Sequence, residues 1–232
     1  MTLLEKVLLK HTDRPIAILD REIPISKYIT LNLSVSNSDL KTLDIANPTI
    51  CQEYIDTILK DEPASVAYGG YLEKRNLYSN SPNFNPKGDE VRNIHLGMDF
   101  WSKAGTRVIV PVGGLVHSFK NNKLPGDYGP TIILKHELDG IQFYTLYGHL
   151  SIESLYGLYK NKEYKPGEVL GTLGDTRINV NYAPHLHFQI IGDIGHFRGD
   201  YPGVCTKKDL FEYQQNCPNP NLLLKITPGI IG

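Results

Sequence analysis

The sequence predicts a mainly β fold, an antiparallel sheet or sandwich with a small α/β extension at the N-terminus. From about Ala67 onward, short runs rich in β-branched and aromatic residues are separated by Gly, Pro and Asn, a texture that is typical of strands joined by turns. Short strands with tight turns indicate an antiparallel sheet or sandwich. A helix-like stretch, residues 151–160, interrupts them. The strands are expected within residues 106–120, 129–138, 141–150, 167–175 and 184–192.

Ahead of this body we expect one strand and one helix. The alternating, β-branched run "YITLNLSVSNSD", residues 28–39, predicts the strand. Helical spacing before Pro63 predicts the helix. The apolar residues with that spacing are Ile50, Tyr54, Ile55 and Ile58. We therefore divide the chain into an N-terminal α/β extension, residues 1–64, which we expect to serve packing, and a main domain with a C-terminal tail, residues 65–232. Within the main domain, the polar stretch 78–90 is expected to run over the surface near a cleft.

Charge and hydrophobicity exclude several classes of protein. The formal net charge is −1 over 232 residues and the charges are scattered, so no basic face favours nucleic acid. Glu5, Lys6 and Lys10 interrupt the N-terminal apolar residues, which leaves no signal core. No later segment approaches the roughly 18 uncharged apolar residues that a membrane span needs. We therefore expect a soluble protein without a membrane span; a cytoplasmic location is favoured, and export by another route stays open.

The cysteines are expected to be structural. Cys51, Cys205 and Cys217 form an odd set without a C-x-x-C pair. Such a set fits neither a disulfide framework nor a thiolate zinc site.

Two histidines in "HLHF" are the first candidates for chemistry. Strand alternation directs His185 and His187 to the same face, with α-carbons about 6.5–7 Å apart, so that both imidazoles can converge on one ion. Leu186, Phe188 and Ile190 alternate with them and would fill the other face. An isolated H-x-H is more often a solvated strand face, but this alternation favours a functional face of a core strand.

A second pattern, H-x-x-x-D, places His95 four residues before Asp99. In an extended strand their α-carbons would be about 13 Å apart, so the chain must bend if they share an ion. Gly97 is the expected bend, because glycine enters positive φ at no steric cost. The pattern is weak alone. Joined to H-x-H on another strand, it gives a candidate three-ligand zinc site with a fourth position open for water.

His149 ends the alternating stretch "FYTLYGH", residues 143–149. A lone histidine at a strand end is more often simply hydrogen-bonded. Beside a zinc site, it would accept a proton from the attacking water or stabilise a developing oxyanion.

The order of these motifs resembles that of the lysostaphin/LytM-type, or β-lytic, zinc metallopeptidases. The similarity runs from about Arg92 to Ile191. Its motifs are His95 to Asp99, "AGTRVIVPVGGLV" (104–116), "YGPTIILKH" (128–136), "LYGHLS" (146–151), "KPGEVLGTLG" (165–174) and "PHLHF" (184–188). The resemblance implies a groove over the sheet and one zinc ion. The implied zinc ligands are His95, Asp99 and His187, and the implied catalytic pair outside the metal is His149 and His185.

The activity that the resemblance implies is hydrolysis of a peptide bond in a peptide or a peptidoglycan-derived substrate, such as a cross-link or stem peptide. Zinc would polarise the scissile carbonyl and activate the attacking water. One of His149 and His185 would take the proton of that water, and the other would hydrogen-bond the tetrahedral intermediate; which does which stays open. Tyr128 and Tyr182 are candidates to line the groove, although packing is the commoner role of such tyrosines.

A narrower resemblance extends over most of the chain. It is to the variant of this domain that is fused to class III aminotransferases and kinase-like domains in large intracellular proteins, which have no evident route to a cell wall. The stretches that carry it are "LNLSVSN", "RNIHLGMDFW", "DYGPTI", "PHLHFQII", "DYPGV" and "CPNPNLL". Gln189 departs from the wall-hydrolase pattern, in which an acidic residue is usual, and "GDTRINVNYAPH" (174–185) lengthens the approach to the last motif. These departures bear on the substrate more than on catalysis.

Three other classes are weighed against a metallopeptidase. A catalytically silent or regulatory module of the same fold, which would bind a metal or a peptide, stays the main alternative. Against it, all five polar site positions are intact. A lipoyl- or biotinyl-type carrier is disfavoured, because "KPGEVLGTLG" lacks a lysine flanked by methionines at a turn. A serine hydrolase is disfavoured by the absence of G-x-S-x-G from the sequence.

Overall fold

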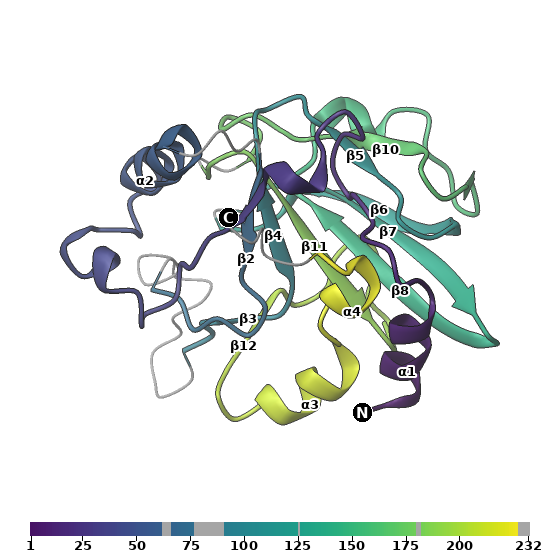
Figure 1. Ribbon diagram of the computed structural model, residues 1–232. Helices are drawn as coiled ribbons and strands as arrows, with labels where there is room; N and C mark the ends of the chain where they lie inside the picture. The colour runs from purple at the N-terminus through teal and green to yellow at the C-terminus, as the bar shows by residue number, and fades with distance from the viewer. Residues whose placement is uncertain (62–65, 77–90, 125, 180–181, 227–232) are drawn as a thin grey trace.

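One eight-stranded sheet forms the centre of the protein in a computed structural model, which describes all residues except 62–65, 77–90, 125, 180–181 and 227–232 (Figure 1). The strand order is β1-β2-β4-β11-β8-β7-β6-β9. β1 and β2 pair in parallel and the other neighbours pair antiparallel. The predicted fold class is thus confirmed. The strands are β1 (Tyr28–Thr30), β2 (Val66–Gly69), β4 (Met98–Trp101), β6 (Gly114–Asn122), β7 (Gly129–Leu138), β8 (Ile141–Gly148), β9 (Glu163–Tyr164) and β11 (His185–Ile191).

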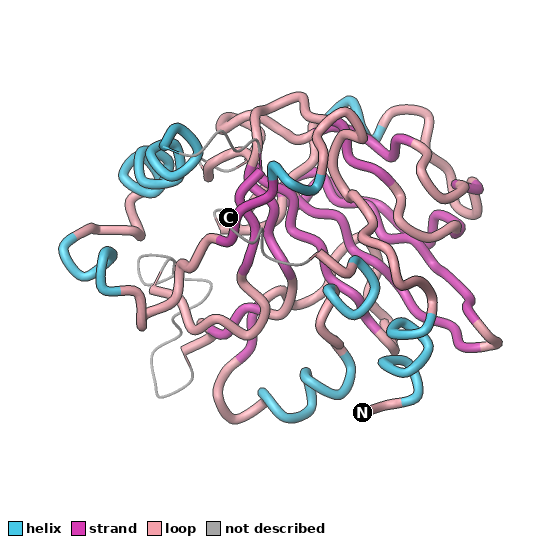
Figure 2. Tube along the Cα trace, in the orientation of Figure 1, coloured by secondary structure: helices cyan, strands magenta, loops and turns pink. Residues whose placement is uncertain are grey.

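Two small ribbons and several helices surround this sheet (Figure 2). One ribbon pairs β5 (Arg107–Ile109) with β10 (Val169–Thr172), and the other pairs β3 (Ile94–His95) with β12 (Val204–Cys205). The α-helices are α1 (Leu3–Lys10), α2 (Pro48–Asp61), α3 (Leu210–Asn216) and α4 (Asn221–Leu224). Short 3-10 turns are η1 (Ile25–Lys27), η2 (Ser38–Thr42) and η3 (Ile152–Leu155). Among the described residues, no helix is long and apolar enough to cross a bilayer.

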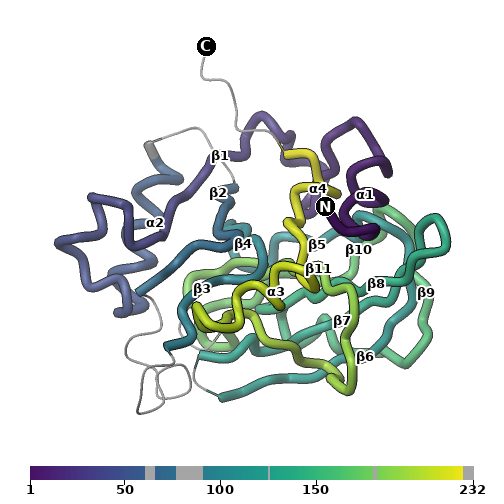
Figure 3. The backbone as a smooth tube through the Cα atoms, turned by 90° about the horizontal axis from the view of Figure 1, so that it is seen from below, coloured from purple at the N-terminus to yellow at the C-terminus, as the bar shows by residue number. Residues whose placement is uncertain are grey.

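One face of the sheet is the main hydrophobic core. α1 and α4, from opposite ends of the chain, lie side by side near this face (Figures 1 and 3), and the β5/β10 ribbon completes the cover. As the alternation predicted, Leu186, Phe188 and Ile190 of β11 point into this core. The core also contains Leu4, Leu8, Phe100, Val108, Leu170, Leu223 and Leu224. The alternate residues of β4 and β11 therefore come out on the opposite face.

That opposite face carries the candidate site residues. The antiparallel register sets His187 of β11 across from Asp99 of β4, and His185 across from Trp101. α2 packs against β2, near the β1 edge of the sheet (Figure 3). There, Cys51 and Ile55 share a small apolar cluster with Trp101. Segments before residue 62 thus contact both faces of the sheet.

The N-terminal strand is shorter than the sequence predicted. Only Tyr28–Thr30 forms β1, because polar side chains of the remaining run bond to nearby backbone instead of allowing a ladder. Asn32 Oδ1 accepts the amide of Ser34, and the side chain of Asn37 donates to the carbonyl of Asn32. The predicted helix is present as α2. The division of the chain between residues 64 and 65 stays a prediction.

The helix-like stretch 151–160 contains only the single turn η3. Gly157, at φ +67°, takes the left-handed conformation that ends a helical turn. The strand predictions for 129–138 and 184–192 match β7 and β11. The predicted surface stretch 78–90 lies outside the described residues.

Candidate functional site

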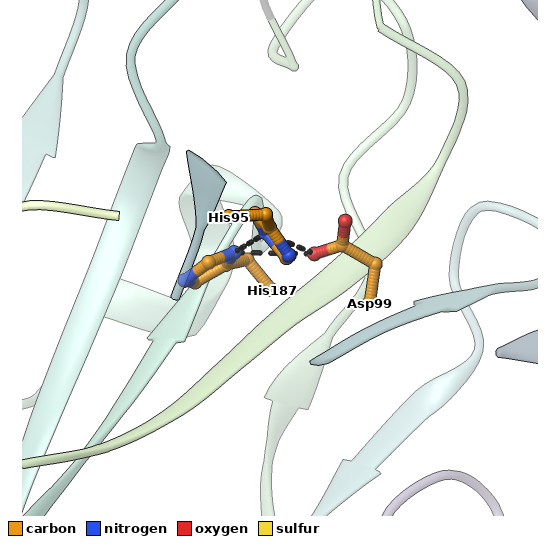
Figure 4. Close-up of side chains that lie close together, drawn as sticks. All are labelled: His95, Asp99 and His187. Carbon is orange, nitrogen blue, oxygen red and sulfur yellow. Dashed lines mark hydrogen bonds and ion pairs between the residues drawn. The ribbon is translucent and has the colours of Figure 1, made fainter. Parts of the chain in front are cut away.

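The three predicted ligand side chains meet at one point (Figure 4). His95 Nε2 lies 2.9 Å from His187 Nδ1, and Asp99 Oδ1 lies 3.1 Å from His187 Nδ1 and 3.3 Å from His95 Nε2. Each residue is buried, with 2 to 3% of its surface exposed. The sheet brings Asp99 and His187 together through their register, while His95 arrives from the adjacent β3.

The chain bends between His95 and Asp99 as predicted, but the expected reason was wrong. Gly97 sits at the bend without a positive φ. Glycine is required there by close packing, since a Cβ would lie 2.7 Å from His187 Cε1 and 2.8 Å from the carbonyl oxygen of Phe188. The absent side chain therefore lets the His187 ring lie against this segment.

Hydrogen bonds on the outer side of each ring set the tautomers of the two histidines. His95 Nδ1 lies 2.9 Å from the Gly70 carbonyl, which can only accept, so Nδ1 carries the proton and the Nε2 lone pair faces Asp99. Gln189 Nε2 donates to the Pro202 carbonyl at 3.1 Å, which turns Gln189 Oε1 toward His187 Nε2 at 2.9 Å. His187 therefore donates from Nε2 and directs the Nδ1 lone pair inward.

This cluster fits a cation. Two imidazole lone pairs and one carboxylate oxygen lie within 4.8 Å of one another and none of the three atoms can donate to another, so a positive ion is the partner that would stabilise them. His, His and Asp are zinc ligands, and three protein ligands leave a position open. Burial, with the positive charge of Arg75, lowers the pKa of His95 to about 4 and keeps it neutral.

Asp99 is held as a carboxylate. Burial alone would raise its pKa, but the guanidinium of Arg75 beside it helps to hold the pKa of Asp99 well below its usual range. Arg75 Nη1 lies 2.5 Å from Asp99 Oδ2, on the side away from the histidines. The sequence reasoning missed Arg75, because a single basic residue outside any motif gives no signal of burial.

The predicted catalytic pair lies beside the ligands. The rings of His149 and His185 lie against each other with centroids 4.1 Å apart and their planes tilted by 37°. His185 Nδ1 donates to the Ala183 carbonyl at 2.7 Å. His149 Nδ1 is buried and meets no hydrogen-bond partner among the described residues. Burial lowers the pKa of both histidines, and the proximity of His185 lowers that of His149 further, so both rings are neutral near pH 7.

His149 also has an unusual backbone. Its φ of +61° is left-handed, which is rare for a residue other than glycine. Two backbone bonds hold it there: its amide donates to the Tyr128 carbonyl at 2.7 Å and its carbonyl accepts from the Gly174 amide at 3.0 Å. A residue kept in a sparsely populated conformation by its surroundings is typical of functional sites.

All five predicted residues line one pocket of about 340 Å³. Tyr128 and Tyr182, the predicted groove tyrosines, also line it. Other lining residues were not predicted: Leu33 and Cys51 from the N-terminal segments, the carboxylates Asp127 and Asp200, and Trp101. Burial raises the pKa of Cys51 to about 11, so it stays a thiol, and none of the three cysteines forms a disulfide.

A His/Asp/His set on an antiparallel sheet, with two neutral histidines in the same pocket, has the composition of a zinc-dependent hydrolase site. Residues 93–197 match the model of Peptidase family M23, which confirms the resemblance predicted from the sequence. The match to a peptidase family agrees with the predicted enzyme class, a zinc metallopeptidase. The narrower resemblance to the aminotransferase-fused variant stays a prediction.

Individual relatives cover only parts of the chain. An uncharacterized metalloprotease of Haemophilus influenzae is 35% identical over 95 residues, which are 41% of this chain and 18% of that protein. The catalytic domain of the antimicrobial peptidase lysostaphin from Staphylococcus simulans is 24% identical, with 52% of this chain and 80% of that chain covered and a TM-score of 0.37. A zinc-containing peptidase from Vibrio cholerae is 25% identical, with 42% and 27% covered and a TM-score of 0.35.

Proposed function

We propose that this protein is a zinc-dependent endopeptidase that hydrolyses a peptide bond with an activated water. One observation carries the proposal: the lone pairs of His95 Nε2 and His187 Nδ1 are fixed toward Asp99 Oδ1, beside a pair of neutral histidines in the same pocket. The match of residues 93–197 to Peptidase family M23 supports it.

His95, Asp99 and His187 would hold the zinc, which when bound supplies a Lewis acid and lowers the pKa of a nearby water. His185 is our choice for the general base. Its Nδ1 proton is committed to the Ala183 carbonyl, so its Nε2 is left as the acceptor for the proton of the attacking water.

His149 then takes the second role. Its ring lies against that of His185 and both residues line the pocket, so a ring N–H of His149 can donate to the developing oxyanion. Because burial keeps both rings neutral, one can accept a proton while the other donates a hydrogen bond.

The substrate class proposed is a peptide, with peptidoglycan cross-links or stem peptides as one source. Apolar and acidic side chains both line the pocket. Leu33 and Trp101 belong to one apolar cluster. Burial raises the pKa of Asp127, and the charge of nearby Asp200 raises it further. The cytoplasmic location expected from the sequence would favour an intracellular peptide over the assembled wall.

The test joins metal analysis to cleavage assays. Purified protein is analysed for zinc and incubated with purified peptidoglycan and with a mixed peptide library, before and after chelation. We expect stoichiometric zinc and cleavage that chelation removes and added zinc restores. A folded, zinc-loaded protein that cuts neither substrate would instead favour a silent or regulatory metal-binding module of the same fold.

A further inference from the structure

Arg75 is a buried arginine that bridges two carboxylates next to the candidate ligands. It is only 2% exposed. Its Nη1 lies 2.5 Å from Asp99 Oδ2 and its Nε lies 2.9 Å from Glu73 Oε2. The guanidinium also lies over the ring of Trp101, 5.7 Å from its centroid. Three neighbours thus fix one guanidinium in orientation.

The two oxygens of Asp99 have different partners as a result. Oδ1 faces His95 and His187, whereas Oδ2 is bound to Arg75. A free carboxylate can bind a metal through one oxygen or both. Here the second oxygen is engaged in a charge-assisted hydrogen bond, which is among the stronger kinds in proteins.

We propose that Arg75 is a positioning residue that restricts Asp99 to a single metal-binding oxygen, so that the site keeps open positions for water and a substrate carbonyl. This inference rests on the proposed zinc site. It follows from the orientation of Arg75 and involves no contact between Arg75 and the ion.

The charges beside the site are compatible with this role. A guanidinium near a dication would by itself oppose metal binding. Glu73 accepts from the same guanidinium, so Glu73, Arg75 and Asp99 alternate in sign and together carry a net negative charge. The orientation of Asp99 can therefore be fixed without making the site positive.

Arg75→Lys tests the inference, because lysine keeps the charge but lacks the planar fork that reaches two carboxylates. Zinc affinity is measured by competition with a chromophoric chelator, and visible absorption is recorded for protein loaded with Co²⁺. We expect zinc affinity to fall by about 10 to 100-fold, as for other partners of metal ligands. We also expect weaker cobalt absorption, because a second Asp99 oxygen would raise the coordination number above four.

Arg107→Lys is the matched control. Arg107 bridges Asp20 and Glu22 with the same kind of fork at an exposed position. We expect this variant to leave zinc affinity and the cobalt spectrum unchanged, since neither carboxylate belongs to the site.

Unchanged affinity and an unchanged cobalt spectrum in folded Arg75→Lys would overturn the inference. If that variant does not fold, Glu73→Gln is measured in its place. In this variant Arg75 keeps its contact with Asp99 but loses the charged partner that orients the guanidinium. We expect zinc affinity and cobalt absorption to fall as in Arg75→Lys, but by less. No shift in Glu73→Gln would also overturn the inference. A wild-type protein that binds no zinc refutes the proposed zinc site, and this inference with it, whereas one that binds zinc without cleaving peptides refutes the proposed peptidase function and leaves the role of Arg75 standing.

Discussion

The two histidine pairs of the site differ in how their ring nitrogens are engaged. In the proposed ligand pair, His95 and His187, one nitrogen of each ring donates to a fixed acceptor and the other faces Asp99. In the second pair, His185 is fixed by the Ala183 carbonyl, but His149 Nδ1 is buried without a partner among the described residues. The ligand pair is therefore preorganised, while the second pair keeps capacity for a proton or an oxyanion.

One member of each pair, His187 and His149, differs in its position relative to the sheet. His187 lies within β11 between two paired strands, with Asp99 across from it on one side and Gly148 on the other. His149 follows the end of β8 in a left-handed conformation. A residue inside the ladder is positioned by many backbone bonds, whereas one at a strand end is positioned by the few bonds of its own turn.

The largest effect should come from removing the shared carboxylate of the ligand pair. Asp99→Ala is expected to release the zinc, and to destabilise the fold by about 3 kcal/mol or more because Arg75 loses its buried partner. Elemental analysis of the purified variant and denaturant unfolding measure the two effects. Asp127→Asn, which alters a carboxylate elsewhere in the same pocket, should keep its zinc. Stoichiometric zinc in Asp99→Ala would refute the ligand assignment.

The second prediction addresses the other pair. His149→Ala is expected to keep full zinc and to lower peptide hydrolysis by roughly 10²- to 10⁴-fold, because it removes a group that acts only on protons and on the oxyanion. Turnover and metal content are measured on the same preparation. His185→Ala should behave alike. Loss of zinc in either variant would move that histidine into the ligand set and remove the contrast between the pairs.

A smaller effect is expected at the outer partner of His187. Gln189→Leu removes the acceptor for His187 Nε2 and should weaken zinc binding by roughly 10-fold or somewhat more, since ring orientation and tautomer are no longer fixed. Gln189→Glu keeps an acceptor and should bind zinc at least as tightly as the wild type. Chelator competition measures both, and equal affinity of the leucine variant and the wild type would contradict the role given to Gln189.

The last prediction lies outside the site and concerns His136, a buried histidine with both nitrogens bonded. Its Nδ1 donates to the Gly113 carbonyl at 2.9 Å and its Nε2 accepts from Thr145 Oγ1 at 2.6 Å. Burial lowers the pKa of His136 from 6.5 to about 4. The unfolded chain therefore takes up a proton first, and the stability that His136 contributes is complete above pH 6.5 and falls as the pH drops toward 4.

His136→Gln should remove this contribution. Between pH 7 and pH 5 the wild type should lose about 2 kcal/mol more of its unfolding free energy than the variant does. Denaturant unfolding at the two pH values gives the comparison. If the unfolding free energy of both proteins had the same pH dependence, His136 would not be the source of the loss of stability at low pH.

Much of the architecture was predictable from local patterns. The alternation of apolar residues along 184–192 predicted both the strand and the face on which His185 and His187 lie, because side chains alternate across any strand. The strand predicted over residues 28–39 was too long, because Asn side chains in this run form hydrogen bonds with nearby backbone groups. α1 was not predicted although Thr2 and Glu5 give the local signal of a capping box, whereas α4 is a single turn that packs against α1.

The sequence by itself determined which donor groups are present and that His185 and His187 share one face of a strand. The tertiary structure alone decided which nitrogen of each histidine faces Asp99, because the deciding partners Gly70 and Pro202 are distant in sequence. It also placed Arg75 on the outer oxygen of Asp99. Residue type and strand period are local properties, whereas a tautomer and the partner of a buried charge depend on contacts through space.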